Sequence, residues 1–338
     1  MWLITGTTGL VGGEVLPRLE AARPGRRTYL LKRPEADLTR PSLGLDSGPY
    51  AELQSSVTAI LHCAADTRFH LPLDQARAVN TEGTRRLLEF ARGCPRLEKF
   101  VHLSTVYVAG LTTGCLPEEP LPRPAVFCNT YQQSKYEAEE LVLAAAGGLP
   151  AAIVRLSSLA GDSRTGAIRR FTYVHQLIRL LPRNVLPVAP CDSDAPLDLI
   201  PTDWAAGALV WLLDHAFEPG RVYHLCAGPE ASLTAGEMLD LTLRELDGAG
   251  RAPRLVSLAE YRKFVEESRR SGDRLLNELL RVLDFFLPHL GLYQAFDNRR
   301  TREALAPSGM ELPPIRSYYP RVVRYCLSNA RLSSSAIR

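Results

Sequence analysis

The sequence predicts an α/β protein in which a doubly wound parallel sheet carries a smaller, mostly helical lobe. Strand-like apolar runs alternate with helix-like runs from residue 1 to residue 156, and this alternation is typical of parallel sheets with helices on both faces. A glycine-rich turn joins the first strand to the first helix. With 338 residues, of which 46% are hydrophobic, the chain is long enough to bury one large core with a lobe attached.

The first strand, expected at 1–5, leads into three glycines at three-residue spacing, Gly6, Gly9 and Gly12. In such a turn the first glycine permits the bend, the second lets backbone amides approach a phosphate, and the third lets the helix expected at 10–22 pack closely. A glycine triplet alone is weak evidence, but here the strand and the helix flank it correctly. We therefore expect a dinucleotide pyrophosphate to contact Gly6, Thr8, Gly9, Leu10, Val11 and Gly12.

The second strand, expected at 27–32, ends at Lys32 and Arg33. A carboxylate at this place holds the ribose 2′-hydroxyl of NAD, whereas an arginine accommodates the 2′-phosphate of NADP. Lys32 and Arg33 therefore predict NADP(H) as the cofactor. Two cations on a surface turn would look the same, and the nearby Glu35 keeps NAD open as an alternative.

The middle of the chain carries the residues of a candidate active site. A strand at 57–62, a helix at 72–92, a strand at 98–104 and a helix at 129–146 are expected in that order. Tyr131 and Lys135 lie four residues apart and share a helix face, where the ammonium group is expected to lower the tyrosine pKa. Asn129 is expected to cap this helix. Ser104 and Thr105 end the preceding strand, at the crevice where ligands of such sheets bind.

These residues resemble the extended short-chain dehydrogenase/reductase superfamily of Rossmann-fold enzymes, which has a Thr-Gly-x-x-Gly-x-x-Gly turn and a Ser/Thr, Tyr and Lys active site. Four runs are similar to its branch of thioester reductases and fatty acyl-CoA reductases: 61–69 (LHCAADTRF), 78–84 (AVNTEGT), 102–108 (HLSTVYV) and 197–204 (LDLIPTDW). The resemblance covers about the first two-thirds of the chain, and only Phe296, Asp297 and Asn298 echo it later.

The resemblance implies that NADPH reduces an acyl thioester carried by coenzyme A or by a carrier protein. Tyr131, assisted by Thr105, would protonate the developing oxyanion, while Lys135 would tune Tyr131 and bind the nicotinamide ribose. Ser104 would orient the site. Collapse of the hemithioacetal would release an aldehyde and a thiol, and a second hydride transfer would give the alcohol.

The alternative is an NAD(P)-dependent epimerase, dehydratase or dehydrogenase that acts on a nucleotide sugar or a hydroxy-ketone. The same glycine turn and Tyr-Lys pair serve these enzymes, and the fold does not decide the substrate. A nucleotide sugar would need cationic groups for a second diphosphate, which Arg164, Arg169 and Arg170 would supply.

The resemblance also implies further cofactor contacts. Asn80 would order the active-site backbone and a proton-relay water, although a plain helix cap also explains it. Asp37 takes the place of the acidic residue that faces adenine, but its short spacing from Arg33 predicts that one strand and one helix are missing. Leu156 stands where the family commonly has proline. The other expected contacts are Leu38, Ala64, Ala65, Ser158 and Leu159, together with Tyr131 and Lys135.

The remaining elements define two parts of the chain. A strand at 151–156, a helix at 204–215 and a strand at 222–226 are expected to complete the sheet. Residues 1–162 and 197–227 would form the dinucleotide-binding domain, and residues 163–196 and 228–338 the substrate-binding lobe. The segment 116–124, with four prolines and two glutamates, is expected to be a loop over the active site.

Composition narrows the function further. A formal net charge of +3 is too small to indicate a nucleic-acid partner, and seven cysteines without a Cys-x-x-Cys pair predict no metal site and no disulfide framework. No run is typical of a transmembrane helix or a signal peptide, so we expect a cytoplasmic enzyme. No carrier domain is visible, so the acyl group would arrive on coenzyme A or on a carrier protein in trans. The sequence specifies no oligomeric state.

An apolar stripe at helical spacing lies late in the chain, at Leu276, Leu279, Leu280, Leu283, Phe286 and Leu287. Such stripes are typical of core packing. A lid that faces an acyl chain or a membrane surface is the alternative, although interfacial helices usually carry more cations than this one.

Overall fold

A computed structural model describes residues 1–329 except 125, 186, 249, 272–276, 278–279, 281–288 and 290. Its centre is a six-stranded sheet in the order β11-β6-β4-β3-β1-β2, in which every neighbouring pair is parallel. The strands are β1 (Trp2–Thr5), β2 (Thr28–Leu31), β3 (Ala59–His62), β4 (Lys99–Thr105), β6 (Ala151–Leu156) and β11 (Val222–Leu225). The strand order reverses between β1 and β3. Ligands of open α/β sheets bind at the carboxyl ends of the strands beside such a reversal.

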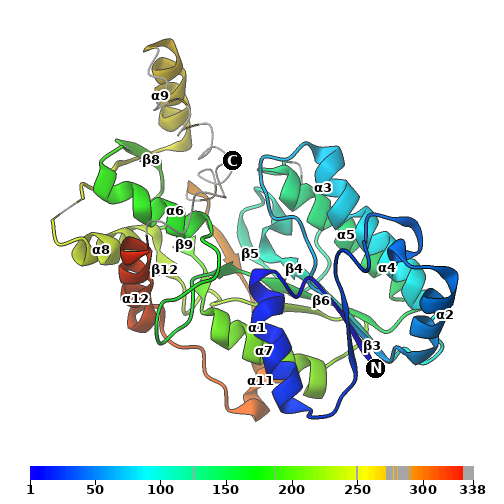
Figure 1. Ribbon diagram of the computed structural model, residues 1–338. Helices are drawn as coiled ribbons and strands as arrows, with labels where there is room; N and C mark the ends of the chain where they lie inside the picture. The colour runs from blue at the N-terminus through cyan, green and yellow to red at the C-terminus, as the bar shows by residue number, and fades with distance from the viewer. Residues whose placement is uncertain are drawn as a thin grey trace.

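Helices cover both faces of this sheet (Figure 1). On one face α1 (Leu10–Ala22) and α7 (Thr202–His215) lie side by side, and Val15, Leu209 and Leu213 pack on Ile4 and Val101. On the other face are α2 (Ser47–Ser56), α3 (Leu73–Asn80), α4 (Glu82–Arg92) and α5 (Thr130–Ala145), whose apolar side chains join Leu3, Ile60 and Phe100. The predicted doubly wound parallel sheet is confirmed.

Two differences from the sequence expectation concern the segments around β3. The single helix expected at 72–92 is two helices, α3 and α4, which meet at Thr81. Between β2 and β3 there are only a 3₁₀ turn, η1 (Pro41–Gly44), and α2, and β2 is the edge strand. This short connection agrees with the expected loss of one strand and one helix.

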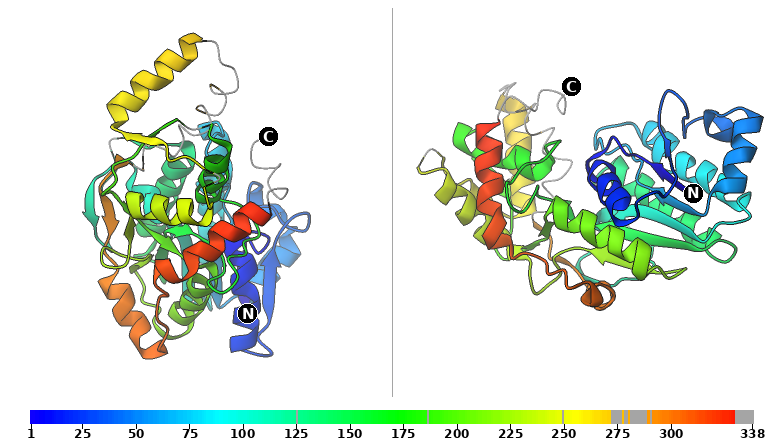
Figure 2. Two further views of the ribbon diagram at one scale, coloured as in Figure 1. Left: turned by 90° about the vertical axis from the view of Figure 1, so that its left-hand side faces the viewer. Right: turned by 60° about the horizontal axis from the view of Figure 1, so that its bottom comes forward.

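The second part of the molecule is mostly helical, as predicted. Its helices are α6 (Tyr173–Leu180), η3 (Leu181–Arg183), α8 (Ala235–Glu245), α9 (Leu258–Ser271), α11 (Arg299–Leu305), η5 (Ala306–Ser308) and α12 (Ile315–Ser328). Figure 2 shows α6, α8 and α12 grouped beside the sheet. Four two-stranded sheets complete it: β10 (Leu199–Ile200) with β7 (Ser158–Leu159), β12 (Leu233–Thr234) with β9 (Pro196–Leu197), β13 (Arg254–Val256) with β8 (Val188–Pro190), and β14 (Gln294–Phe296) with β5 (Gly114–Leu116).

One hydrophobic core joins the helical part to the sheet. Tyr318, Val322 and Val323 of α12 are fully buried and belong to the same cluster as Leu159 and Ile200. Most of the late apolar stripe (Leu276, Leu279, Leu283, Phe286 and Leu287) lies outside the described residues. Within the described part of the chain, no helix is long and apolar enough to cross a membrane.

The proline-rich segment after β5 is a loop, and its polar contacts connect it to α5, β6 and α11. The buried Glu118 carboxylate accepts hydrogen bonds from the backbone amides of Arg300 and Thr301 at the start of α11. The Glu119 carbonyl accepts from Arg155 of β6, and the Leu121 carbonyl accepts from Tyr136 of α5. The loop therefore ties α5 to α11, and the expectation that it also covers the active site stays a prediction.

Candidate active site

The glycine turn after β1 has no room for side chains at two of its three glycines. Gly6 adopts a φ of 73°, and a Cβ there would lie 2.5 Å from the amide nitrogen of Ala64. A Cβ on Gly12 would lie 2.4 Å from the Gly6 carbonyl oxygen. Gly9 is the N-cap of α1, whose first turn has no acidic residue. The free amides at this helix end therefore form a place suited to a phosphate.

The other expected pyrophosphate contacts, Thr8, Leu10 and Val11, are partly or fully exposed around the same helix end. Thr5 Oγ1, at the end of β1, accepts a hydrogen bond at 3.1 Å from the amide of Ala64, which follows the neighbouring strand β3. Ala64 and Ala65 thus follow β3 directly beside the glycine turn.

The end of β2 presents two exposed cations, Lys32 and Arg33. The Asp37 carboxylate accepts hydrogen bonds from both the amide and the hydroxyl of Thr39, each at 2.8 Å. Burial raises the pKa of Asp37, but these bonds and the charges of Arg33 and Arg40 lower it further, so the net shift is downward. The Leu38 side chain is buried in the core.

Asn80 ties the loop after β3 to α5. Its Oδ1 accepts from the Asp66 amide at 2.7 Å, and its Nδ2 donates to the Asp66 carbonyl at 3.0 Å and to Ser134 Oγ at 2.9 Å. The residue is 1% exposed and ends α3, so the alternative expectation of a helix N-cap is wrong. The amide instead fixes the backbone of the crevice.

Tyr131 and Thr105 meet at the carboxyl end of β4. Asn129 caps α5 as expected, with Oδ1 accepting from the Gln132 amide at 3.0 Å, and Tyr131 is in the first turn of that helix. The Tyr131 side chain is partly exposed, makes a hydrogen bond with Thr105, and lies with its ring 5.7 Å from that of Phe69. The neighbouring Ser104 hydroxyl is buried and has no partner within the described residues.

Burial raises the pKa of Tyr131 to about 12, although the hydrogen bond with Thr105 lowers it. The expectation that Lys135 lowers this pKa is therefore wrong for the structure as it stands. The reason is the position of the lysine. Its Nζ donates to the Leu103 carbonyl at 2.8 Å and lies 2.9 Å from His102 Nε2. Burial lowers the pKa of Lys135 to about 8, against the effects of Glu139 and Cys63.

Sequence reasoning missed a group of hydroxyls on the far side of β4. Ser158 Oγ lies 2.7 Å from Tyr107 Oη, which lies 2.8 Å from Tyr173 Oη, and Ser158 also bonds to Tyr173. Tyr107 is part of the motif 102–108, so the sequence could have indicated it. No pattern in the sequence around Tyr173 indicates a functional residue. Leu156, Ser158 and Leu159 are all buried here.

Tyr173 also lines an apolar cavity of about 110 Å³ inside the helical part. The cavity lies between α6 and α8, and its walls include Leu177, Met238 and Leu255. Because the Tyr173 side chain belongs both to the cluster of three hydroxyls and to the wall of the cavity, the cluster and the cavity are adjacent.

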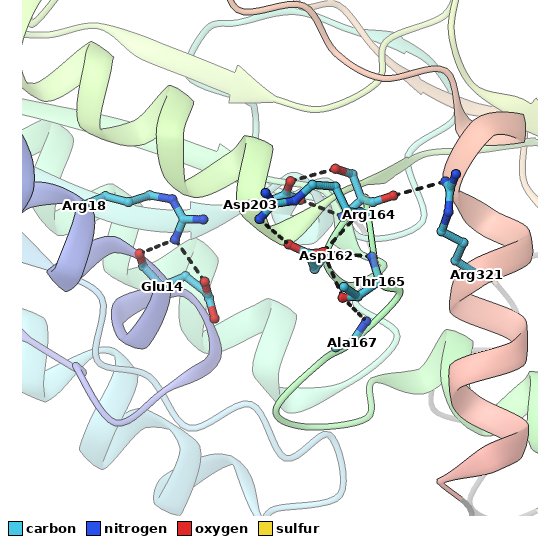
Figure 3. A network of polar contacts seen from close by, with 9 residues as sticks. Glu14, Arg18, Asp162, Arg164, Thr165, Ala167, Asp203 and Arg321 are labelled. Atoms are coloured by element: carbon cyan, nitrogen blue, oxygen red, sulfur yellow. Dashed lines mark hydrogen bonds and ion pairs between the residues drawn. The ribbon is translucent and has the colours of Figure 1, made fainter.

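Two of the three arginines that a nucleotide sugar would need, Arg164 and Arg169, have carboxylate partners. The Asp162 carboxylate accepts from the Arg164 and Thr165 amides, and Asp203 accepts from the Ser163 amide (Figure 3). The guanidinium groups of Arg164 and Arg169 lie 3.7 and 3.5 Å from the carboxylates of Asp162 and Glu14.

Comparison with known proteins gives a consistent set of similarities. A family model described as male sterility protein, an NAD-binding family, matches residues 31–209. The isonitrile lipopeptide synthase of Streptomyces coeruleorubidus is 36% identical over 246 residues, covering 62% of this chain and 16% of that protein. Rat fatty acyl-CoA reductase 1 is 26% identical over 226 residues, covering 57% of this chain and 43% of the reductase. The chain thus spans less than half the length of these two relatives.

Among solved structures, the terminal R domain from the myxalamid PKS-NRPS pathway is similar with a TM-score of 0.81 and 28% identity, covering 98% of this chain and 91% of that domain. A UDP-glucuronic acid 4-epimerase from Bacillus cereus has a TM-score of 0.67 at 16% identity, covering 97% of this chain and 98% of the epimerase. At that identity the epimerase shows a shared fold alone.

Proposed function

Because the chain belongs to the male sterility family of NAD-binding proteins, we propose that it uses NADPH to reduce acyl thioesters. The family and the relatives identify an NAD(P)-dependent oxidoreductase of the extended short-chain type, as the sequence predicted. The observation that carries the proposal is that Tyr131, a partly exposed residue, has its hydroxyl hydrogen-bonded to Thr105 at the carboxyl end of β4.

The residues present fit a dinucleotide. The turn at Gly6 and Gly12 excludes side chains, and the amides at the start of α1 would hold the pyrophosphate. Thr8, Leu10 and Val11 lie at that helix end, Ala64 and Ala65 follow β3, Leu156 ends β6, and Ser158 and Leu159 form β7. When bound, the reduced nicotinamide supplies a hydride to the substrate.

We assign NADP(H) rather than NAD(H) on the charges at the end of β2. Lys32 and Arg33 are exposed there and free to approach a 2′-phosphate. Of the two carboxylates in the turn, Asp37 is already engaged by Thr39, and the exposed Glu35 is the group that would favour NAD(H) instead. A guanidinium suits a phosphate because several N–H groups can donate at once.

In the proposed reaction the Tyr131 hydroxyl gives its proton to the carbonyl oxygen as the hydride adds to the carbonyl carbon. The raised pKa of Tyr131 keeps it protonated, and therefore a donor, before the reaction. Thr105 helps to stabilise the negative charge that develops on the carbonyl oxygen. The resulting hemithioacetal breaks its C–S bond, and the products are an aldehyde and a thiol. Lys135 would bind the nicotinamide ribose, and Ser104, whose hydroxyl has no partner in the described residues, would donate to substrate or cofactor.

An acyl chain fits the apolar cavity better than a sugar nucleotide does. The cavity beside Tyr173 is lined mainly by leucine, valine, isoleucine and methionine side chains. Arg164 and Arg169, which a second diphosphate would need, face Asp162 and Glu14. We therefore assign residues 163–196 and 228–338 to the acyl group and residues 1–162 and 197–227 to the cofactor. The thiol end would belong to coenzyme A or to a carrier protein.

The test is an assay that pairs NADPH with decanoyl coenzyme A or a decanoylated carrier protein, and follows thiol release together with cofactor oxidation. The proposal expects one thiol for the first NADPH consumed, and none when the substrate is a nucleotide sugar. Turnover of a nucleotide sugar without thiol release from either thioester would contradict it.

A further inference from the structure

Lys135 is held beneath α5, against the central strand of the sheet. The side chain is 1% exposed, and its Nζ has two polar partners within the described residues, His102 Nε2 at 2.9 Å and the Leu103 carbonyl at 2.8 Å. A lysine ammonium has three N–H donors. Two of them are therefore used by β4, and one is left for a ligand.

His102 is an unusual partner for a lysine because the contact leaves the histidine unsatisfied. The ring is fully buried, and its Nδ1 has no hydrogen-bond partner within the described residues. The ammonium can only donate, so Nε2 must accept and the ring proton must be on Nδ1. A buried N–H without an acceptor costs free energy. Packing alone therefore does not account for a histidine at this position.

His62, the register partner of His102 on β3, shows what a satisfied histidine in this layer looks like. Its Nδ1 lies 2.8 Å from Thr5 Oγ1 and its Nε2 lies 2.9 Å from Thr84 Oγ1. Thr84 Oγ1 in turn donates to the Asn80 carbonyl, so it accepts from His62. His62 thus has both partners without the lysine, whereas the only polar partner of the His102 ring in the described residues is Lys135.

We propose that His102 is a positioning residue, which holds the ammonium group of Lys135 at the carboxyl end of β4 through its Nε2 lone pair. The proposal rests on the role proposed above for Lys135 in binding the nicotinamide ribose. Because Nζ lies against β4 on His102 and Leu103, its third N–H is the one left to donate to the ribose.

The groups that face Lys135 come from three elements. Glu139 of α5 and Cys63 after β3 raise its pKa, while burial lowers it to about 8. His62 of β3 and His102 of β4 both feel its charge, and burial keeps their pKa values low, so both are neutral. A hydrogen-bond acceptor stabilises the ammonium form. Removing His102 Nε2 therefore lowers the pKa of Lys135 further.

The first experiment compares His102→Leu, which removes the acceptor, with His102→Gln, which offers an amide oxygen in its place. The profile of kcat/KM against pH is measured from about pH 6 to about pH 10 with NADPH and a decanoyl thioester. In His102→Leu we expect the alkaline limb to move down by about one pH unit and NADPH to bind roughly tenfold more weakly. His102→Gln is expected to restore both.

His175→Gln is the matched control, because His175 is also fully buried but bonds to Thr172 and the Ala160 carbonyl, on α6 and after β7. This variant tests what the loss of a buried imidazole away from Lys135 does to stability and activity. The alkaline limb of its kcat/KM profile should stay at the same pH as in the unmodified protein. An unmoved limb in His102→Leu, with only a loss of thermal stability, would overturn the proposal.

A second measurement needs neither a folded leucine variant nor a known substrate. In the full-length protein labelled with ¹⁵N-histidine, the His102 resonances are identified by their loss in His102→Gln. The proposal expects Nε2 of His102 to be unprotonated and Nδ1 protonated at neutral pH, and the reverse would overturn it. If this tautomer is found but no thioester is turned over, the proposed function fails while the lysine–histidine contact stands.

Discussion

At the scale of single residues, the sequence predicted the chemical groups and missed their partners. Tyr131 and Lys135 were recognisable from their spacing on one helix, which depends only on local geometry. The contact of Lys135 with His102 joins residues 33 positions apart, on different elements, and no local pattern encodes it. The expected lowering of the Tyr131 pKa failed for this reason, since it assumed that the ammonium faces the phenol.

The first prediction concerns the proton donor. Tyr131→Phe removes only the hydroxyl that bonds to Thr105, so the fold and NADPH binding should be kept. We expect kcat to fall about a hundredfold to ten-thousandfold, the usual contribution of a general acid. Tyr136→Phe on the same helix loses a hydroxyl that donates to the Leu121 carbonyl, and it should keep nearly full activity. Equal activity of the two variants would remove Tyr131 from the mechanism.

The second prediction concerns the choice of cofactor. Arg33→Ala should weaken NADPH binding about tenfold to a hundredfold, because a charge-assisted hydrogen bond contributes roughly 1.5 to 3 kcal/mol. NADH binding should change little, since NADH has no 2′-phosphate.

Fluorescence titration with both cofactors measures this, and Arg27→Ala is the control. Arg27 is an exposed arginine just before β2, at the opposite end of the strand from Arg33, so the two variants lose the same charge. Equal affinities of the unmodified protein for NADPH and NADH would contradict the assignment to NADP(H).

At the scale of elements, long periodic segments were predicted well and short ones were not. The helix at 129–146 was expected within one residue of α5 at either end. The break between α3 and α4 was missed because residues 80–82 include neither glycine nor proline. The break coincides with the tertiary contacts of Asn80 with Asp66 and Ser134. Strands of two or three residues, such as β9 and β13, are too short to show any periodicity.

The third prediction concerns the cavity between α6 and α8. Leu177→Trp places a larger side chain in the wall of this cavity. Long acyl chains should then no longer fit, whereas short ones should still bind. We expect kcat/KM for a decanoyl thioester to fall at least tenfold, which corresponds to burying roughly two fewer methylenes, and kcat/KM for an acetyl thioester to stay nearly constant.

Leu180→Trp on the same helix is the matched control, because Leu180 packs against the same apolar cluster as Leu177 but does not line the cavity. The measurement is a chain-length series for both variants. If Leu177→Trp affects all chain lengths alike, the cavity does not bind the acyl chain.

At the scale of the whole molecule, the alternation of strands and helices sufficed to predict the parallel sheet. The helical part was harder, because its segments come from separate regions of the chain and share one core with the sheet through α12. The core of the molecule contains several buried histidines. Their hydrogen-bond partners fit the neutral ring and not the charged one. Besides His102, three histidines of the described residues, His62, His175 and His224, are at most 1% exposed.

Each of these histidines is bonded as a neutral ring. His224 accepts from Arg155 through Nε2 and donates to the Asp297 carbonyl through Nδ1. His175 accepts from the Thr172 amide and donates to the Ala160 carbonyl. A second ring proton would face another donor in both cases. Burial accordingly lowers the pKa values to about 3 for His62 and His224 and to about 4 for His175.

The last prediction follows from these values. The folded-state pKa of each ring lies below that of the unfolded chain, about 6.5, so between about pH 6.5 and the folded values the unfolded chain binds more protons. The free energy of unfolding therefore falls as the pH falls through this window, by about 1.4 kcal/mol per pH unit for each histidine. Burial also lowers the pKa of His102 and His289, which add to the slope in the same direction. Urea unfolding at about pH 7, 6 and 5 measures this slope. His175→Gln should reduce the slope by about 1.4 kcal/mol per pH unit, and an equal slope with and without that histidine would mean that the folded protein protonates it.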